Sequence, residues 1–105
     1  MNEVEQVIME LIIHAGNARS LAIEAISKAR EDSFEEADSL MKQADEEMIT
    51  AHKAQSQLLF NETNGSQVPL TLLMVHAQDH VMNAMTVKDL ANEIIENMKK
   101  ERKDI

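Results

Sequence analysis

Apolar residues recur at every third or fourth position along almost the whole chain, and this spacing predicts three long α-helices. They span about residues 3–29, 33–61 and 69–101, the last beginning near Pro69, which the first turn of a helix tolerates. In the second helix the spacing forms a regular heptad stripe that contains one polar residue, Gln55. The stripe consists of Phe34, Ala37, Met41, Ala44, Met48, Ala51, Gln55 and Leu58.

Two of the predicted helices begin with residues at capping-box spacing. Asn2 precedes Glu5 by three positions, and Ser33 precedes Glu36 by the same distance. A short polar side chain at such a position accepts a hydrogen bond from a backbone N–H of the first turn. Both pairs are therefore expected to cap the helices that follow them.

Composition agrees with a helical protein of one domain. The chain has 105 residues, 2% aromatic residues, two Gly and one Pro, so few positions favour turns. Three helices with short connections predict an all-α, antiparallel three-helix bundle. Gly16 lies inside the first predicted helix, where glycine costs about 1 kcal/mol relative to alanine. A close approach of another helix is the expected reason for a glycine there.

The first half of the third helix is apolar on nearly all sides from Leu70 to Met85, whereas the second half is amphipathic. A helix that is apolar all round needs to be covered on every side. A three-helix bundle leaves one face of each helix in water. Another copy of the chain is the simplest cover for this segment.

The formal net charge of −9 argues against a nucleic-acid-binding protein or one that binds an anionic membrane surface, since both need a basic face. There is no apolar run of membrane-spanning length and no leader-like start. The absence of cysteine fits a reducing cytoplasm. The acidic surface favours a protein partner with a basic rim.

Polar residues interrupt the apolar half of the third helix. At about 100° per residue, His76, Asp79, His80 and Asn83 share one arc, whereas Gln78 points almost the opposite way. The two histidines are compatible with a structural polar network, with a metal such as zinc that takes Asp79 as a third ligand, or with a nucleophile that carries a phosphoryl group. The residue pattern leaves these three possibilities open.

Two motifs resemble a known family. The stretch His76-Ala77-Gln78-Asp79-His80-Val81-Met82 is similar to the active-site signature of enzyme IIA of the lactose/cellobiose class of the bacterial phosphoenolpyruvate-dependent sugar phosphotransferase system. Val81 replaces the leucine that is more usual there. The stretch Gly16-Asn17-Ala18-Arg19-Ser20 is similar to the G-x-A-R-S of that family's first helix. With the three-helix layout, the resemblance covers nearly the whole chain.

The resemblance implies a phosphoryl carrier in the cytoplasm. His76 would accept phosphate from the phosphocarrier HPr and donate it to a cysteine of enzyme IIB. The family is a homotrimer whose third helices gather around the threefold axis. Asp79 of each subunit would meet its two symmetry mates there and bind a divalent cation, with Mg²⁺ expected. Gln78 would assist across a subunit boundary, and His80 would either aid His76 or complete a polar network.

Two other classes of protein are alternatives to the phosphoryl carrier. A histidine phosphotransfer domain of a two-component relay usually carries a lysine near its histidine in a four-helix bundle, and neither feature is seen here. A helical adaptor without chemistry would use the histidines structurally. The sugar is not encoded in this chain, because lactose, cellobiose and chitobiose types share the motif and enzyme IIA does not contact the sugar.

Overall fold

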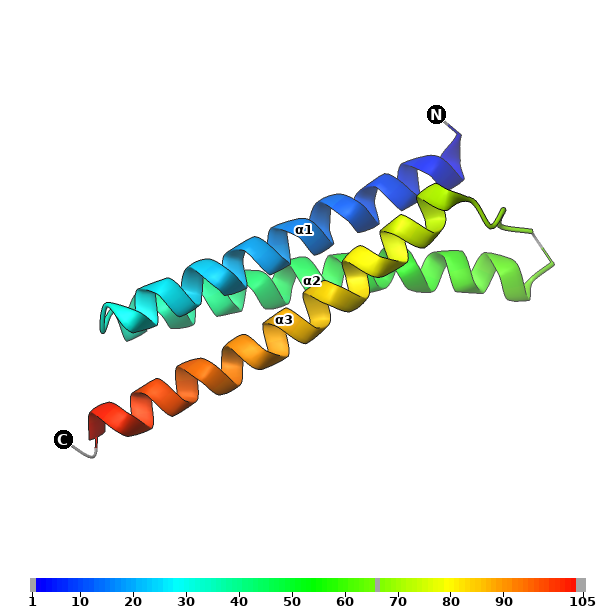
Figure 1. Ribbon diagram of the computed structural model, residues 1–105. Helices are drawn as coiled ribbons and strands as arrows, with labels where there is room; N and C mark the ends of the chain where they lie inside the picture. Colours follow the sequence, from blue (N-terminus) through cyan, green and yellow to red (C-terminus); the bar gives the residue numbers. More distant parts are fainter. Residues whose placement is uncertain (1, 66, 104–105) are drawn as a thin grey trace.

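The computed structural model describes residues 2–65 and 67–103, and within these ranges it contains helices but no strand. The helices are α1 (Glu3–Arg30), α2 (Phe34–Thr63) and α3 (Leu72–Lys103). α2 runs antiparallel to the other two, so α1 and α3 point the same way in an elongated bundle (Figure 1). The predicted all-α three-helix bundle is confirmed for the single chain.

The two expected capping boxes have different outcomes. The backbone N–H of Glu5 donates to Asn2 Oδ1 at 2.8 Å, so the first cap is present. Ser33 occupies the N-cap of α2, but its side chain makes no capping hydrogen bond. The prediction of a second capping box was therefore wrong. Ser33 follows directly on Asp32, whose positive φ of 66° belongs to the tight turn between α1 and α2.

The third helix begins later than its sequence indicates. The N–H of Met74 donates to Thr71 Oγ1 at 3.1 Å, and the N–H of Val75 donates to the carbonyl of Thr71 at 3.1 Å. Thr71 thus acts as the cap, and the helix starts at Leu72 rather than near Pro69. Pro69 belongs to the connection from α2.

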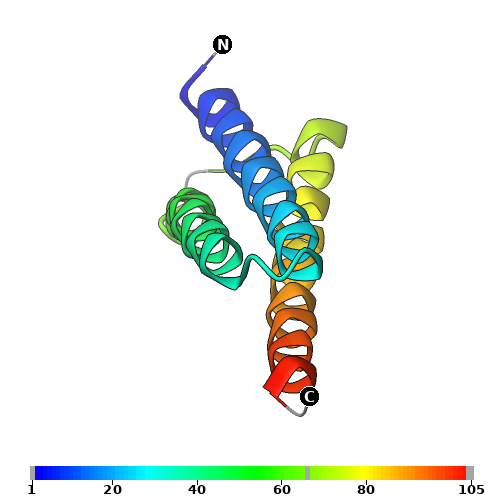
Figure 2. The same ribbon diagram turned by 90° about the vertical axis from the view of Figure 1, so that its left-hand side faces the viewer.

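The interior of the bundle is made mostly of alanine. Buried residues form two clusters, one at each end of the molecule, and α1 contacts both neighbours extensively while α2 and α3 contact each other far less. Seen along the bundle, α2 and α3 accordingly lie on either side of α1 (Figure 2). The stripe predicted for α2 is buried from Ala37 to Leu58, with Gln55 half-buried within it, and Phe34 at its start is also half-buried.

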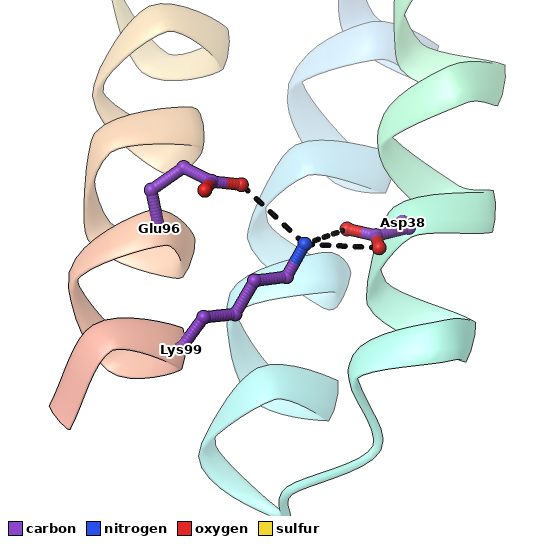
Figure 3. A network of polar contacts seen from close by, with 3 residues as sticks. All are labelled: Asp38, Glu96 and Lys99. Carbon is purple, nitrogen blue, oxygen red and sulfur yellow. Dashed lines mark hydrogen bonds and ion pairs between the residues drawn. The ribbon is translucent and has the colours of Figure 1, made fainter. Parts of the chain in front are cut away.

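Ion pairs join the end of α3 to the start of α2. Lys99 Nζ lies 2.8 and 2.9 Å from the two carboxylate oxygens of Asp38 and 3.4 Å from Glu96 Oε1 (Figure 3). The hydrogen bond with Asp38 raises the pKa of Lys99 above its usual value. Arg102 also contacts Asp32 in the turn between α1 and α2. The basic C-terminal end of α3 is therefore held by acidic groups from distant parts of the chain.

Gly16 is not explained by packing within one chain. It lies half-buried in α1, but a Cβ added there would meet nothing within 4 Å. The expected close approach of another helix is not seen within the described part of one chain, because α1 turns its alanines rather than Gly16 toward the core. An approach by a helix of another chain stays a prediction.

Candidate functional site

The two histidines of the motif form a pair on α3. They are one helical turn apart, and their Nε2 atoms lie 3.1 Å from each other. The rings meet edge to face, with centroids 4.5 Å apart and an interplanar angle of 89°. One ring must donate and the other accept, since a neutral imidazole has one N–H and one bare nitrogen. The pair thus fixes which nitrogen of each ring faces the other.

His76 is the more accessible of the two rings, because its residue is exposed whereas His80 is half-buried. Beside it is a hollow of about 420 Å³ lined by Leu72, Leu73 and His76. The two leucines are 85% and 37% exposed. An accessible imidazole bordered by apolar surface suits contact with another protein.

Asp79 lies on the outward face of α3, away from the bundle core. Its neighbours along that face are Leu72, Val75 and Met82, which alternate spacings of three and four with Asp79 and are all exposed. Such spacing is that of a stripe that packs against other helices. Within one chain this face has no cover, as the sequence predicted for the first half of α3.

A metal site within one chain is not supported. Across residues 2–65 and 67–103, no group of three or more His, Cys, Asp or Glu side chains is placed to hold a metal ion. His76, Asp79 and His80 therefore do not form the three-ligand zinc site considered from the sequence. A site formed by Asp79 from several copies of the chain remains a prediction.

Gln78 faces away from the histidine pair, as its position in the helix predicts. Its Oε1 accepts a hydrogen bond of 2.7 Å from Gln55 Nε2 on α2, and its Nε2 lies 3.8 Å from Met74 Sδ. The structure therefore does not bring Gln78 to His76 of the same chain. Gln55 was visible in the sequence as the single polar residue of an apolar stripe, but its partner was not.

Arg19 is the basic residue of the second motif. Arg19 is exposed on α1, and among the residues described no hydrogen bond or ion pair connects it to His76 or His80. Among the described residues, His76 and His80 are therefore hydrogen-bonded to each other and to no lysine or arginine. The polar groups in contact on this part of α3 are the rings of His76 and His80.

A groove separates α2 from α3 on the side that carries Gln78. Its volume is about 630 Å³, and its lining is Asp45, Met48, Ile49, His52, Lys53, Met85, Lys88 and Asp89. Gln78 lies seven residues before Met85, and Gln55 lies seven residues after Met48. The two glutamines therefore lie on the same α2–α3 side as the groove, two helical turns farther along.

A three-helix bundle with an accessible histidine pair on its last helix is compatible with the IIA component of the sugar phosphotransferase system that the two motifs resemble. Residues 6–99 match the family described as the lactose/cellobiose-specific IIA subunit of that system. The chain therefore belongs to this family, and the resemblance seen in the two motifs is confirmed.

Relatives within the family are similar over most of their length. The lichenan-specific phosphotransferase enzyme IIA component of Bacillus subtilis is 54% identical over 94 residues, which cover 90% of this chain and 86% of the relative. The lactose-specific EIIA component of Staphylococcus epidermidis is 38% identical, with 94% and 95% of the two chains covered.

Solved structures of IIA proteins share the fold. The cellobiose-specific enzyme IIA of Bacillus anthracis superposes with a TM-score of 0.94 at 43% identity, covering 97% of this chain and 94% of that one. The IIA chain in the IIA(Chitobiose)–HPr complex of the Escherichia coli phosphotransferase system gives a TM-score of 0.83 at 35% identity, with coverage of 97% and 99%. Among the described residues of this protein, no helix is long and apolar enough to cross a membrane.

Proposed function

We propose that this protein is a cytoplasmic phosphoryl carrier that accepts phosphate from phospho-HPr on His76 and passes it to a cysteine of enzyme IIB. The sugar taken up would be of the lactose, cellobiose or chitobiose type. The observation that carries the proposal is the accessible His76 ring, whose Nε2 lies 3.1 Å from His80 Nε2. Family membership and the HPr complex formed by a structural relative support HPr as the donor.

The transfer needs a bare nitrogen on His76. With the proton of His76 on Nδ1, its Nε2 carries the lone pair and accepts the N–H of His80. The hydrogen bond from His80 breaks, and the freed lone pair forms the new bond to phosphorus as the donor's P–N bond breaks, with the bond electrons staying on the donor ring. The donor leaves as neutral imidazole because its second nitrogen is protonated, and the Nδ1 proton of His76 passes to solvent.

His80 would then assist the product state. Its Nε2–H is directed at the nitrogen that becomes phosphorylated, so it is within reach of the phosphoryl oxygens once the new bond has formed. In phosphoryl transfer the protein acts mainly by positioning groups and stabilising charge. The partner protein would supply most of the positive charge, since no lysine or arginine of the described residues is hydrogen-bonded to His76.

We further propose a homotrimer with Asp79 at its threefold axis. The exposed stripe of Leu72, Val75, Asp79 and Met82 supports this arrangement, because it has coiled-coil spacing and no cover in one chain. Three carboxylates brought together repel one another strongly at low dielectric. A hard divalent cation such as Mg²⁺, with water completing its oxygen ligands, would relieve that repulsion.

The assignment of His76 is tested by phosphorylation of the purified chain. Incubation with phosphoenolpyruvate, enzyme I and HPr should add one acid-labile phosphoryl group, measured by intact mass. His76→Gln should fold and assemble but gain no phosphate. A normally labelled His76→Gln beside an inactive His80→Gln would show that the other histidine carries the group.

The same experiment separates the two alternative classes. A helical adaptor would gain no phosphate under any of these conditions. A histidine phosphotransfer domain would be labelled by a sensor kinase and would ignore phospho-HPr. Omission of HPr from the mixture provides the matched control, because enzyme I alone should leave the chain unlabelled.

A further inference from the structure

Gln55 interrupts the buried stripe of α2 with a polar side chain, yet that side chain has a definite partner. Its Nε2 donates to Gln78 Oε1 at 2.7 Å, across the contact between α2 and α3. Both residues are half-buried, where an amide without a partner is costly. The hydrogen bond therefore links α2 directly to the helical turn that also carries His76.

The contacts determine which edge of the Gln78 amide faces inward. Its Oε1 is occupied by Gln55, and its Nε2 lies 3.8 Å from Met74 Sδ. A thioether sulfur accepts hydrogen bonds but cannot donate them, which agrees with the NH₂ group beside it. One N–H of Gln78 is then left without a hydrogen bond to any residue in the described part of the chain.

We propose that Gln55 is a positioning residue for phosphoryl transfer: it holds the Gln78 amide so that its NH₂ group is available to donate to a phosphoryl oxygen. This inference rests on the proposed function and its trimer. Gln78 lies on the opposite side of α3 from His76, so the phosphoryl group it serves is the one on a neighbouring copy. Phosphoryl oxygens accept hydrogen bonds, and an amide turned the other way would present its own lone pairs to them.

The variant Gln55→Glu distinguishes orientation from packing. Glutamate has nearly the same size and still forms a hydrogen bond, but its carboxylate can only accept. The NH₂ group of Gln78 should turn toward it, which leaves Oε1 facing the phosphoryl group. The rate constant of transfer from phospho-HPr should fall about 100- to 1000-fold, as when one donor to a transition-state oxygen is removed. The half-saturating phospho-HPr concentration and the mass of the assembly should not change.

Two controls test whether the loss of transfer rate in Gln55→Glu acts through Gln78. Gln57→Glu places the same added charge on an exposed position of α2, where Gln57 donates to Asn61, and should leave the transfer rate near that of the parent chain. Gln55→Glu should also have little further effect when Gln78 has already been replaced by Met. An equal rate loss in the presence and absence of Gln78 would overturn the proposal.

The outcomes separate this inference from the function on which it rests. A parent chain that gains no phosphoryl group would refute the proposed function itself. A parent chain that is phosphorylated while Gln55→Glu transfers at the normal rate would overturn the role of Gln55 alone. The role of Gln55 would be supported if Gln55→Glu slows transfer only when Gln78 is present and leaves the half-saturating phospho-HPr concentration unchanged.

Discussion

The packing of α3 can be tested by the same chemical change at two valines that face opposite ways. Val81 is fully buried in the cluster that also holds Leu11 and Ala77, whereas Val75 is 44% exposed. Val81→Ala removes two buried methyl equivalents at about 0.8 kcal/mol each, and the cavity left behind brings the expected loss of unfolding free energy to about 2–3 kcal/mol. Val75→Ala should cost the isolated chain less than about 1 kcal/mol, because that side chain is partly in water already.

Urea unfolding at protein concentrations across about a 100-fold range would separate folding from assembly, because the stability of an oligomer depends on concentration. Val81→Ala should lower the unfolding midpoint at every concentration. If the outward face of α3 lies in a trimer, Val75→Ala should act mainly by lowering the trimer fraction at low concentration, measured by light scattering. Equal unfolding midpoints for Val81→Ala and the parent chain would refute the packing of α3 described here.

Three further predictions concern single positions. Gly16→Ala should raise the unfolding free energy by about 0.5–1 kcal/mol, since an added Cβ meets nothing within 4 Å. A loss of stability, measured by calorimetry or urea unfolding, would indicate that another chain approaches Gly16. Lys99→Met should lower stability by up to about 1 kcal/mol at neutral pH. The pKa of Lys99 is raised above 10.5 in the fold. The stabilisation by Lys99 is therefore complete below pH 10.5 and is lost as the pH rises through the folded pKa. The urea midpoints of Lys99→Met and the parent chain should converge in alkali. At neutral pH a chelator should loosen the proposed trimer of the parent chain, and mild acid should partly restore it. Asp79→Leu should ignore both treatments in light scattering, and a parent chain whose assembly is indifferent to metal would refute the proposed cation at the threefold axis.

Local patterns in the sequence were sufficient to predict the three helices and the sides of α3 on which the motif residues lie. The spacing of apolar residues defined which face of each helix is buried, because that spacing matches the turn of the α-helix. The same geometry placed His76 beside His80 and Gln78 on the other side of α3. The cap at Asn2 was also predictable, since its partner Glu5 is three residues away.

Other features depended on contacts between residues far apart in the chain. Gln55 and Gln78 are 23 positions apart, and no periodicity indicates that the two amides meet. Lys99 and Asp38 pair across 61 positions, and no local pattern in the sequence indicates that contact. The start of α3 at Leu72 depended on which of several residues near Pro69 formed the cap, and that residue is Thr71.

The sequence by itself determined the helical pattern, the identity of the histidine motif and the outward apolar face of α3, because each is encoded within a few turns of one helix. Only the tertiary structure decided that Gln78 is held by Gln55, that Ser33 leaves its helix uncapped and that Gly16 meets no helix of its own chain. These depend on how closely and at what angle separate helices approach, and on the exact path of the turns between them. Those quantities result from the packing of all side chains together, so no single stretch of sequence contains them.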